Sequence, residues 1–184
     1  MTWGQNPKYF EDYLPEVRNI LRFSHELQEL GNLFLRTLNI PQYEYTCIHI
    51  RRTDFVWLGV STNMNDTINA AQSIAKEKNI SRFMIFGDDQ GFMSQMAMKL
   101  SDGSQNVNAT FVSSFTDGTD LYIASRACKS FLISAATSTF GWWLAFFTRF
   151  QNNVYYLADR RQHADKRPSK ELFLYVSLLF EQKL

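Results

Sequence analysis

The sequence lacks any hydrophobic run long enough to span a bilayer, and it lacks an excess of charge of either sign. Nineteen Lys and Arg residues stand against eighteen Asp and Glu residues, so the net charge of the 184-residue chain is +1. No overall electrostatic field exists to hold nucleic acid or an anionic membrane, and any anion site must be local. The first residues, MTWGQNPKYFEDY, also lack the basic start and apolar middle of a signal peptide. These absences predict either a cytosolic protein or a polypeptide without an upstream segment.

Cysteine is scarce as well. Cys47 and Cys128 are the two cysteines, and both lie in apolar surroundings. This favours two small buried side chains over a disulfide framework or a metal site. Three Asn-x-Ser/Thr sequons begin at Asn65, Asn79 and Asn108, and they predict possible N-glycosylation of a protein in the secretory pathway.

Several catalytic motifs are missing. The sequence contains no Gly-x-Ser-x-Gly elbow, no Gly-rich dinucleotide loop and no Walker loop, which disfavours a hydrolase or a dehydrogenase. Asp88 and Asp89 form an acidic pair, but no third carboxylate or histidine lies at a recognisable spacing. The sequence therefore predicts no metal site.

The patterns that are present alternate between helix and strand. Apolar residues recur at helical spacing from Lys8 to Leu38, and Pro41 ends that pattern. β-rich runs then follow at 46–51, 82–89, 108–114, 129–135 and 153–159. Helical patterns separate them at 67–78, 91–100, 120–128 and 139–150, and a last helix is expected after Pro168.

This order predicts the fold class. Five nearly continuous apolar strands with helices between them indicate an α/β protein with a Rossmann-like, doubly wound parallel sheet covered on both faces. The chain then consists of a helical N-terminal segment, residues 1–42, and a Rossmann-like domain, residues 43–184. No other domain boundary is visible.

Polar residues gather where the predicted strands end, and ligands of doubly wound sheets bind outside the carboxyl ends of the strands. These residues are Arg51, Arg52 and Asp54; Gly87, Asp88 and Asp89; Ser113, Ser114, Thr116, Asp117 and Asp120; and Ser134, Thr137, Ser138 and Thr139. Guanidinium groups beside hydroxyls and the free amides of a helix start suit a phosphate or diphosphate. We expect an anionic ligand at this edge.

Structural alternatives stay open for the same residues. Arg51 could pair with Asp54 or Asp88 in an ion-pair network, as is common at strand ends. His49 shares a strand face with Arg51, so it could belong to the site or be a hydrogen-bonded core residue. Ser138 could either receive an anion or simply cap a helix.

Four segments resemble a known family. HIRRTD at 49–54 is similar to the His-x-Arg-Arg-x-Asp signature of α1,2- and α1,6-fucosyltransferases and protein O-fucosyltransferases. FMIFGDD at 83–89 resembles a strand that ends in Ser-Asp-Asp in the α1,2 family, with Gly87 in place of the serine. The block at 120–147, which contains STFGWW, and the early stretch PKYFED occur in family order with these two. The chain therefore resembles glycosyltransferase family 11, the galactoside α1,2-fucosyltransferases.

The resemblance implies the C-terminal, donor-binding half of a B-type glycosyltransferase, with residues 43–184 binding GDP-fucose. It implies inverting transfer of fucose to a galactose hydroxyl of a glycan, with no metal and no cofactor besides the donor substrate. It also implies the lumenal side of the Golgi membrane, reached through an upstream anchor. The alternatives are a truncated, catalytically silent nucleotide-sugar-binding module, or a fucosyltransferase with another acceptor, such as a protein O-fucosyltransferase.

The family's roles can be carried over to matching residues. Arg51 would hold the β-phosphate and stabilise the departing GDP, and Asp120 would contact guanine or order the nucleotide loop. Asp54 and Asp88 are candidates for the base, which stays unassigned. The catalytic residues implied are Arg51 and Asp54. The donor-binding residues implied are His49, Arg51, Arg52, Asp88, Asp120, Ser138, Thr139 and Phe140.

Overall fold

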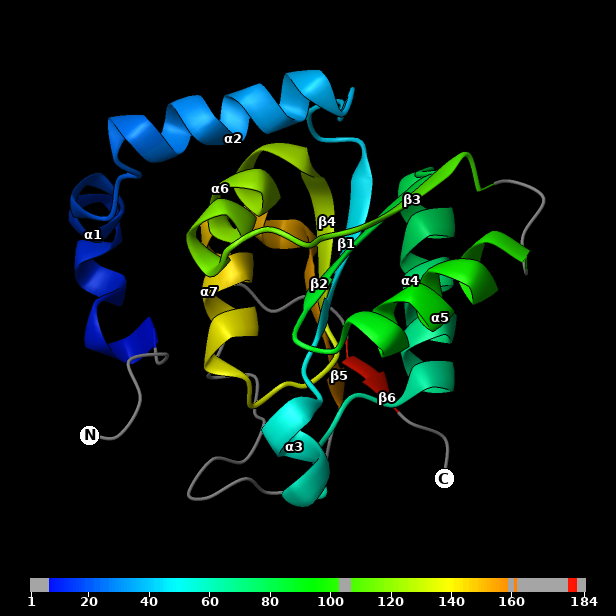
Figure 1. The fold of residues 1–184 in the computed structure, drawn as a ribbon. Helices are drawn as coiled ribbons and strands as arrows, with labels where there is room; N and C mark the ends of the chain where they lie inside the picture. Colours follow the sequence, from blue (N-terminus) through cyan, green and yellow to red (C-terminus); the bar gives the residue numbers. More distant parts are fainter. Residues whose placement is uncertain (1–6, 103–106, 159–160, 162–178, 182–184) are drawn as a thin grey trace.

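The computed structural model describes residues 7–102, 107–158, 161 and 179–181 (Figure 1). Its N-terminal part contains two short 3-10 helices and two α-helices: η1 (Pro7–Tyr9), η2 (Glu11–Tyr13), α1 (Leu14–Ile20) and α2 (His25–Thr37). The helical pattern predicted from Lys8 to Leu38 is thus interrupted. Ser24 starts a new helix, because its Oγ accepts a hydrogen bond from the backbone N–H of Leu27 at 3.3 Å.

In the described part of the chain, six strands form one sheet in which all neighbouring strands are parallel. Their order is β3-β2-β1-β4-β5-β6. The strands are β1 (Tyr45–Ile50), β2 (Arg82–Gly87), β3 (Ala109–Val112), β4 (Cys128–Ile133), β5 (Val154–Ala158) and β6 (Leu179–Glu181). The predicted α/β doubly wound sheet is confirmed, but the sequence predicted five strands and missed β6. Most of the segment after Pro168, where a helix is expected, lies outside the described residues. The three residues of that segment that the structure describes, 179–181, form the strand β6.

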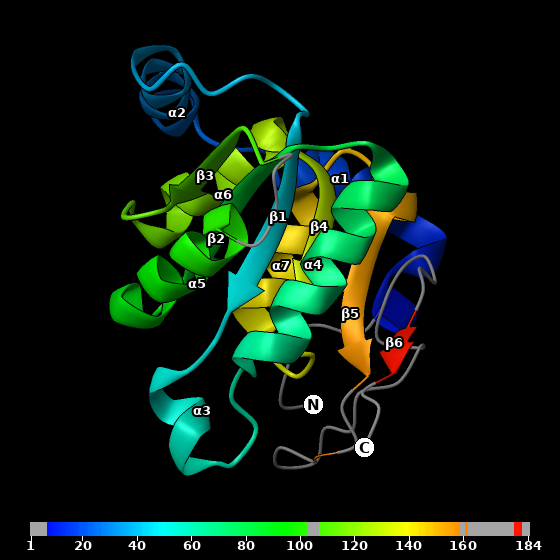
Figure 2. The same ribbon diagram turned by 90° about the vertical axis from the view of Figure 1, so that its right-hand side faces the viewer.

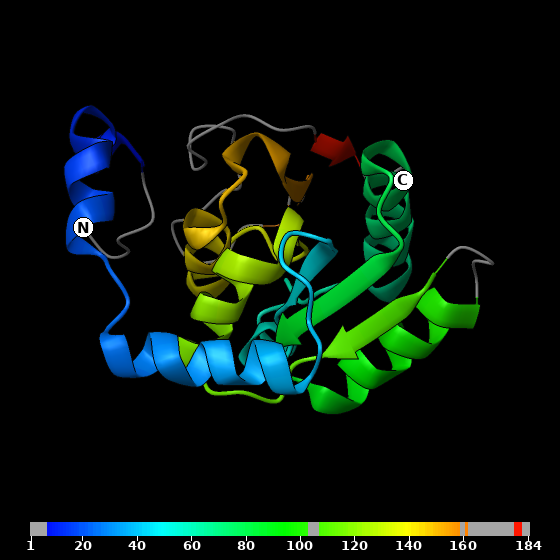
Figure 3. The same cartoon turned by 90° about the horizontal axis from the view of Figure 1, so that it is seen from above.

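Helices cover both faces of the sheet (Figure 1). The first face carries α4 (Met64–Lys78) and α5 (Gln90–Asp102), and the second carries α6 (Asp117–Ala127) and α7 (Thr139–Phe147). The N-terminal helices α1 and α2 lie outside α6 and α7 (Figure 3). Their contacts include the Tyr122 hydroxyl, which donates to Asn32 Oδ1 at 2.9 Å. Among the described helices, none is both long and apolar enough to cross a bilayer.

Strand β1 lies in the interior of the sheet, between β2 and β4, and is buried along its whole length. Successive side chains of a strand point to opposite faces. Cys47 accordingly packs in the cluster that contains α6 and α7, whereas Ile48 and Ile50 pack in the cluster that contains α4 and α5. The alternation places His49 on the same face as Cys47.

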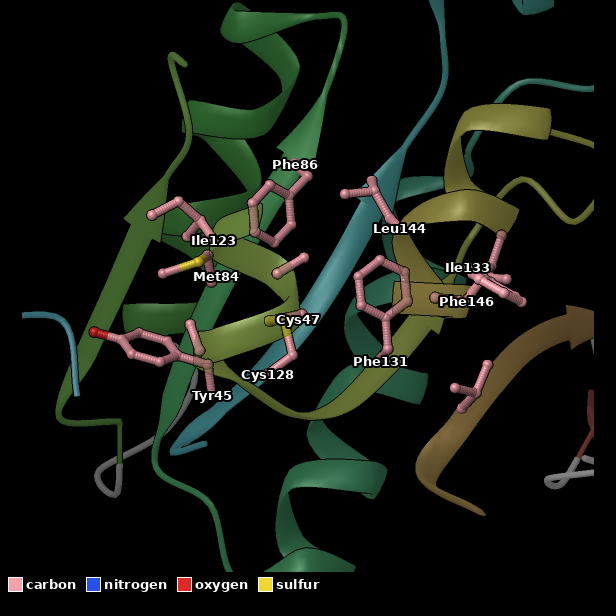
Figure 4. Close-up of a cluster of buried hydrophobic side chains, with 14 of the residues drawn as sticks. Tyr45, Cys47, Met84, Phe86, Ile123, Cys128, Phe131, Ile133, Leu144 and Phe146 are labelled. Carbon is pink, nitrogen blue, oxygen red and sulfur yellow. A yellow bond between two sulfur atoms is a disulfide. The ribbon is translucent and has the colours of Figure 1, made fainter. Parts of the chain in front are cut away.

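The two cysteines form a disulfide, so the prediction of two separate buried thiols is wrong. Cys47 of β1 and Cys128 of β4 are bonded, with their Cα atoms 5.6 Å apart (Figure 4). The two residues are 81 positions apart in the sequence and become neighbours only because β1 pairs with β4. Apolar surroundings could not distinguish a buried thiol pair from a buried disulfide.

The order of strands along the sheet reverses between β1 and β4. From β1 the chain first builds outward through β2 and β3, and it then returns to the other side of β1 with β4, β5 and β6. The loops that follow β1 and β4 therefore lead to helices on opposite faces, and this switch point in strand order is where such sheets bind ligands. The short helix α3 (Thr53–Trp57) lies beyond the carboxyl end of β1 (Figure 2). No pattern in the sequence predicted α3.

Candidate active site

Buried hydroxyl groups connect the loops that follow β1 and β4. Thr62, in the loop before α4, accepts the backbone N–H of Arg51 at 3.0 Å and lies 2.7 Å from Ser134 Oγ. Ser134, directly after β4, donates both its backbone N–H, at 3.3 Å, and its hydroxyl to the carbonyl oxygen of His49. These bonds bring the loops after β1 and β4 together, as the sequence predicted for their edge of the sheet. We call His49, Thr62, Ser134 and Ser138 the hydroxyl half of the edge.

Ionised side chains dominate the neighbouring part, between β1 and β2. We call Arg51, Arg52, Asp54, Asp88 and Asp89 the charged half of the edge. Arg51 Nη2 lies 2.9 Å from Asp54 Oδ1, and Arg51 Nη1 lies 3.2 Å from Asp88 Oδ2. The ion-pair alternative is therefore present in the structure. It does not exclude an anion site, because the Arg51 side chain is 31% exposed and partly exposed pairs exchange partners at little cost.

The guanidinium groups of Arg51 and Arg52 each lie near an aromatic ring. The Arg52 Cζ atom lies 4.1 Å from the ring centroid of Phe92, and the Arg51 Cζ atom lies 5.5 Å from that of Phe55. Arg52 Nε also pairs with Asp89 Oδ2 at 3.1 Å. A planar guanidinium held in this way presents its edges as hydrogen-bond donors, the arrangement that suits a diphosphate.

His49 is completely buried between β1 and α7. Its Nε2 lies 3.4 Å from Ser138 Oγ, and its Nδ1 has no hydrogen-bond partner among the described residues. Burial lowers the pKa of His49 to about 3, with Arg51 acting in the same direction and Asp88 against it. The imidazole is therefore neutral near pH 7, and it is a buried polar group beside the start of α7.

Ser138 caps α7, as the sequence predicted. Its Oγ accepts the backbone N–H of Gly141 at 3.3 Å. Phe140 meets the His49 ring edge-on, with ring centroids 6.1 Å apart. The structure thus brings His49, Ser138 and Phe140 together, with Thr139 as the first residue of α7. A Cβ atom on Gly141 would lie 2.5 Å from His49 Nδ1, so glycine is what allows α7 to approach the ring.

Asp120 lies apart from the arginines, in the first turn of α6 beyond β3. Its carboxylate is buried and accepts a hydrogen bond from the Ser113 hydroxyl. Burial raises the pKa of Asp120 to about 7, although the Ser113 hydrogen bond opposes the rise and Asp117 adds to it. An acid of this kind changes its charge in the physiological range.

The sequence motifs did not indicate Thr62 or the part played by Thr53. Thr53 starts α3 and donates to Asp88 through its hydroxyl at 2.5 Å. No periodic pattern marks Thr62, because it lies in an irregular loop. A threonine directly after an Arg-Arg pair was the available signal for Thr53.

The remaining predicted sites are on the surface. Asn65, Asn79 and Asn108, the three sequon asparagines, are all exposed, and their glycosylation stays a prediction. In the described part of the chain, no three His, Cys, Asp or Glu side chains cluster in a way that could hold a metal ion.

Comparisons with known proteins agree with the fold and motifs. Residues 2–175 match the family described as Glycosyl transferase family 11. The Caenorhabditis elegans protein svh-11 is 30% identical over 163 residues, which cover 82% of this chain and 43% of that protein. A galactoside 2-alpha-L-fucosyltransferase of the same organism is 33% identical over 112 residues, covering 60% of this chain and 31% of that enzyme. The chain thus spans less than half the length of these relatives.

Solved structures share the fold at low sequence identity. The crystal structure of POFUT1 in complex with GDP has a TM-score of 0.55 and 10% identity, and covers 73% of this chain and 47% of that chain. POFUT1 in complex with GDP-fucose gives a TM-score of 0.54 at 11% identity, covering 73% and 46%. These similarities show that the Rossmann-like sheet shares the fold of POFUT1. The family match extends over nearly the whole sequence, and the chain belongs to glycosyl transferase family 11.

Proposed function

We propose that this chain binds GDP-fucose and forms the donor-binding part of a galactoside α1,2-fucosyltransferase. The observation that carries the proposal is the position of Arg51, directly after the carboxyl end of β1, the strand at which the strand order of the sheet reverses. Ser138, the N-cap of α7 after the neighbouring strand β4, contacts His49, two residues before Arg51. The naming of the C. elegans relative and the ligand of the POFUT1 structure support the choice of donor.

The proposed reaction forms a bond between the acceptor oxygen and C1 of fucose while the bond from C1 to the β-phosphate oxygen breaks. GDP leaves with the bonding electron pair, so negative charge grows on the diphosphate in the transition state. A fixed guanidinium that meets this charge lowers the barrier. Attack from the face opposite GDP would invert C1, and the hydroxyl proton passes to a base that we do not assign.

The acceptor and the compartment belong to the same proposal. The acceptor is a galactose hydroxyl of a glycan, by analogy with the named relative. A lumenal location in the Golgi is supported by the Cys47–Cys128 disulfide, because disulfides persist in oxidising compartments. The three exposed sequon asparagines are compatible with that location.

Calorimetry with GDP tests the donor site. Wild-type protein should bind GDP, and Arg51→Ala should weaken binding by about 1.5 to 3 kcal/mol, the range for a charge-assisted hydrogen bond. Arg82→Ala is the matched control, because Arg82 pairs with Glu44 at the opposite end of the sheet and should leave GDP affinity unchanged. No GDP binding by folded wild-type protein would contradict the proposal.

A second candidate is a nucleotide-sugar-binding unit without transferase activity. It is favoured by the pairing of Arg51 with two carboxylates and by the share of the relatives that the chain covers. A radiolabelled transfer assay from GDP-fucose to a β-galactoside separates the two candidates. Transfer of label would exclude the silent unit, whereas GDP binding without transfer would favour it.

A further inference from the structure

We infer that Asp88 is a positioning residue that orients Arg51 toward the diphosphate, and that it is not the base of the reaction. The inference rests on the proposed function, because it concerns the same guanidinium. It separates two carboxylates, Asp88 and Asp54, that the motif alone treats as equivalent candidates. Both pair with Arg51, yet the structure holds them in very different ways.

The carboxylate of Asp88 is occupied on both oxygens. Oδ1 accepts the backbone N–H of Arg52 at 2.8 Å. Oδ2 accepts the backbone N–H of Thr53 at 3.2 Å and its hydroxyl at 2.5 Å, and it lies 3.2 Å from Arg51 Nη1. A carboxylate has about four acceptor positions, so little capacity remains for the proton of an acceptor hydroxyl.

These bonds make Asp88 part of the framework that shapes the arginine loop. The backbone N–H groups of Arg52 and Thr53 open α3 and have no partner within that helix. Asp88, which directly follows β2, accepts hydrogen bonds from both N–H groups, as an N-cap side chain does at the start of its own helix. Its side chain is only 18% exposed. The carboxylate is therefore fixed before any ligand arrives, and it fixes the Nη1 edge of Arg51.

Gly87 allows this reach between strands. It pairs with Ile50 at the ends of β2 and β1. A Cβ atom on Gly87 would lie 2.4 Å from the carbonyl oxygen of Ile50, a backbone atom that cannot move aside alone. The close approach of the two strand ends sets Asp88 directly beside the loop after β1.

Asp54 is held far less firmly. It lies three residues from Arg51, and its side chain is 54% exposed. Apart from Arg51 Nη2, its side-chain partner is the Thr53 hydroxyl at 3.4 Å. Burial raises the pKa of Asp54, but the hydrogen bonds and charge of Arg51 outweigh burial and hold that pKa below its usual value. A diphosphate can replace Asp54 at Nη2 while Asp88 keeps Nη1 in place.

The two roles predict opposite effects on GDP binding. Removal of either negative charge by Asp→Asn reduces repulsion of the diphosphate, so charge alone predicts tighter binding for both variants. If Asp88 positions Arg51, Asp88→Asn should instead weaken GDP binding by about tenfold, because the freed guanidinium loses its orientation. Asp54→Asn, the matched control, should strengthen it by roughly two- to fivefold, since an internal competitor is removed.

A double-mutant cycle supplies a readout that a purely structural role would not produce. In an Arg51→Ala background, Asp88→Asn should change GDP affinity by less than about twofold, because the group that it positions is gone. GMP, which lacks the β-phosphate, should bind wild-type protein and Asp88→Asn equally. Calorimetry with GDP and GMP on wild-type protein, both single variants and the double variant measures these effects, with circular dichroism to establish folding.

Each other outcome overturns the inference. If Asp88→Asn binds GDP more tightly than wild-type protein, Asp88 only competes with the diphosphate for Arg51. If Asp88→Asn weakens GDP binding equally with and without Arg51, Asp88 does not act through Arg51. If Asp88→Asn does not fold, Thr53→Val is the substitute variant, because it removes one hydrogen-bond donor to Asp88. This variant should weaken GDP binding about two- to threefold in protein that contains Arg51, and it should have no effect in the Arg51→Ala background. Failure of folded wild-type protein to bind GDP would instead overturn the proposed function itself, together with this inference.

Discussion

The two halves of the carboxyl edge handle polarity in opposite ways. In the charged half, Arg51 and its partners lie partly in solvent and neutralise one another. In the hydroxyl half, His49, Thr62, Ser134 and Ser138 are almost completely buried and carry no charge near pH 7. Full charges remain where water can reach them, whereas neutral groups fill the buried positions between β1 and β4. The difference shows that only the charged half keeps its ionic groups accessible to an ion from solution.

Asp120 breaks this division, because it is a buried carboxylate whose interacting neighbours among the described residues are Ser113 and Asp117. Its substitution should have a larger effect than the changes at Gly141 and Thr62. The pKa of Asp120 is raised to about 7 in the folded protein, above the ordinary value of 3.8. The protonated form therefore favours folding at low pH, and this stabilisation is lost as the pH rises from about 4 through 7. The loss should reach on the order of 4 kcal/mol above pH 7.

Asp120→Asn removes that titration. Urea unfolding at several pH values should show that the free energy of unfolding of the variant increases relative to that of wild-type protein between about pH 4 and pH 8. Asp102→Asn, at an exposed carboxylate at the end of α5, is the control and should follow the wild-type curve. A difference between Asp120→Asn and wild type that does not vary with pH would contradict the burial explanation.

Gly141→Ala tests how tightly the hydroxyl half is packed. The added Cβ would meet the buried His49 ring, so the free energy of unfolding should fall by about 1 to 3 kcal/mol, as for overpacked cores. Urea denaturation measures this loss, and a His49→Ala background should abolish most of it. The control is Gly91→Ala in α5, whose Cβ would make only an ordinary contact at 3.7 Å. Equal effects at the two glycines would mean that the His49 contact is unimportant.

Thr62→Val tests the hydrogen bonds of the hydroxyl half, and it should change the free energy of unfolding by less than the two changes above. The change keeps the side-chain shape but leaves the backbone N–H of Arg51 and the hydroxyl of Ser134 without their common partner. The free energy of unfolding should fall by roughly 1 to 2 kcal/mol. Thr62→Ser keeps the hydroxyl and should lose less stability in the same thermal or urea experiment. Equal losses in the two variants would mean that the methyl group contributes as much as the hydrogen bonds, and no loss in Thr62→Val would mean that the hydrogen bonds do not contribute.

Much of the fold could be predicted because local patterns report burial. The apolar runs that became β1, β2 and β4 were found near their observed positions, and Ser138 was identified as the start of a helix. The break before Ser24 and the helix α3 were not found. Periodicity continues across a short break, and a five-residue helix contains too few turns to show a pattern.

The candidate site was only partly predictable for a related reason. The sequence placed Arg51, Asp54 and Asp88 on one edge, but it could not choose between an ion-pair network and an anion site. It also could not rank the two aspartates, because that ranking depends on donors from Arg52 and Thr53 that lie 36 and 35 residues from Asp88. Thr62 gave no signal at all.

The sequence by itself determined that this protein is a parallel α/β structure with its polar residues at the carboxyl ends of the strands. It did so because helix and strand periods, and the polarity change at a strand's end, are properties of neighbouring residues. Only the tertiary structure decided that β1 lies between β2 and β4, that Cys47 meets Cys128, and that Asp88 holds the arginine loop. Strand order depends on packing between segments far apart in the chain, which no local pattern encodes.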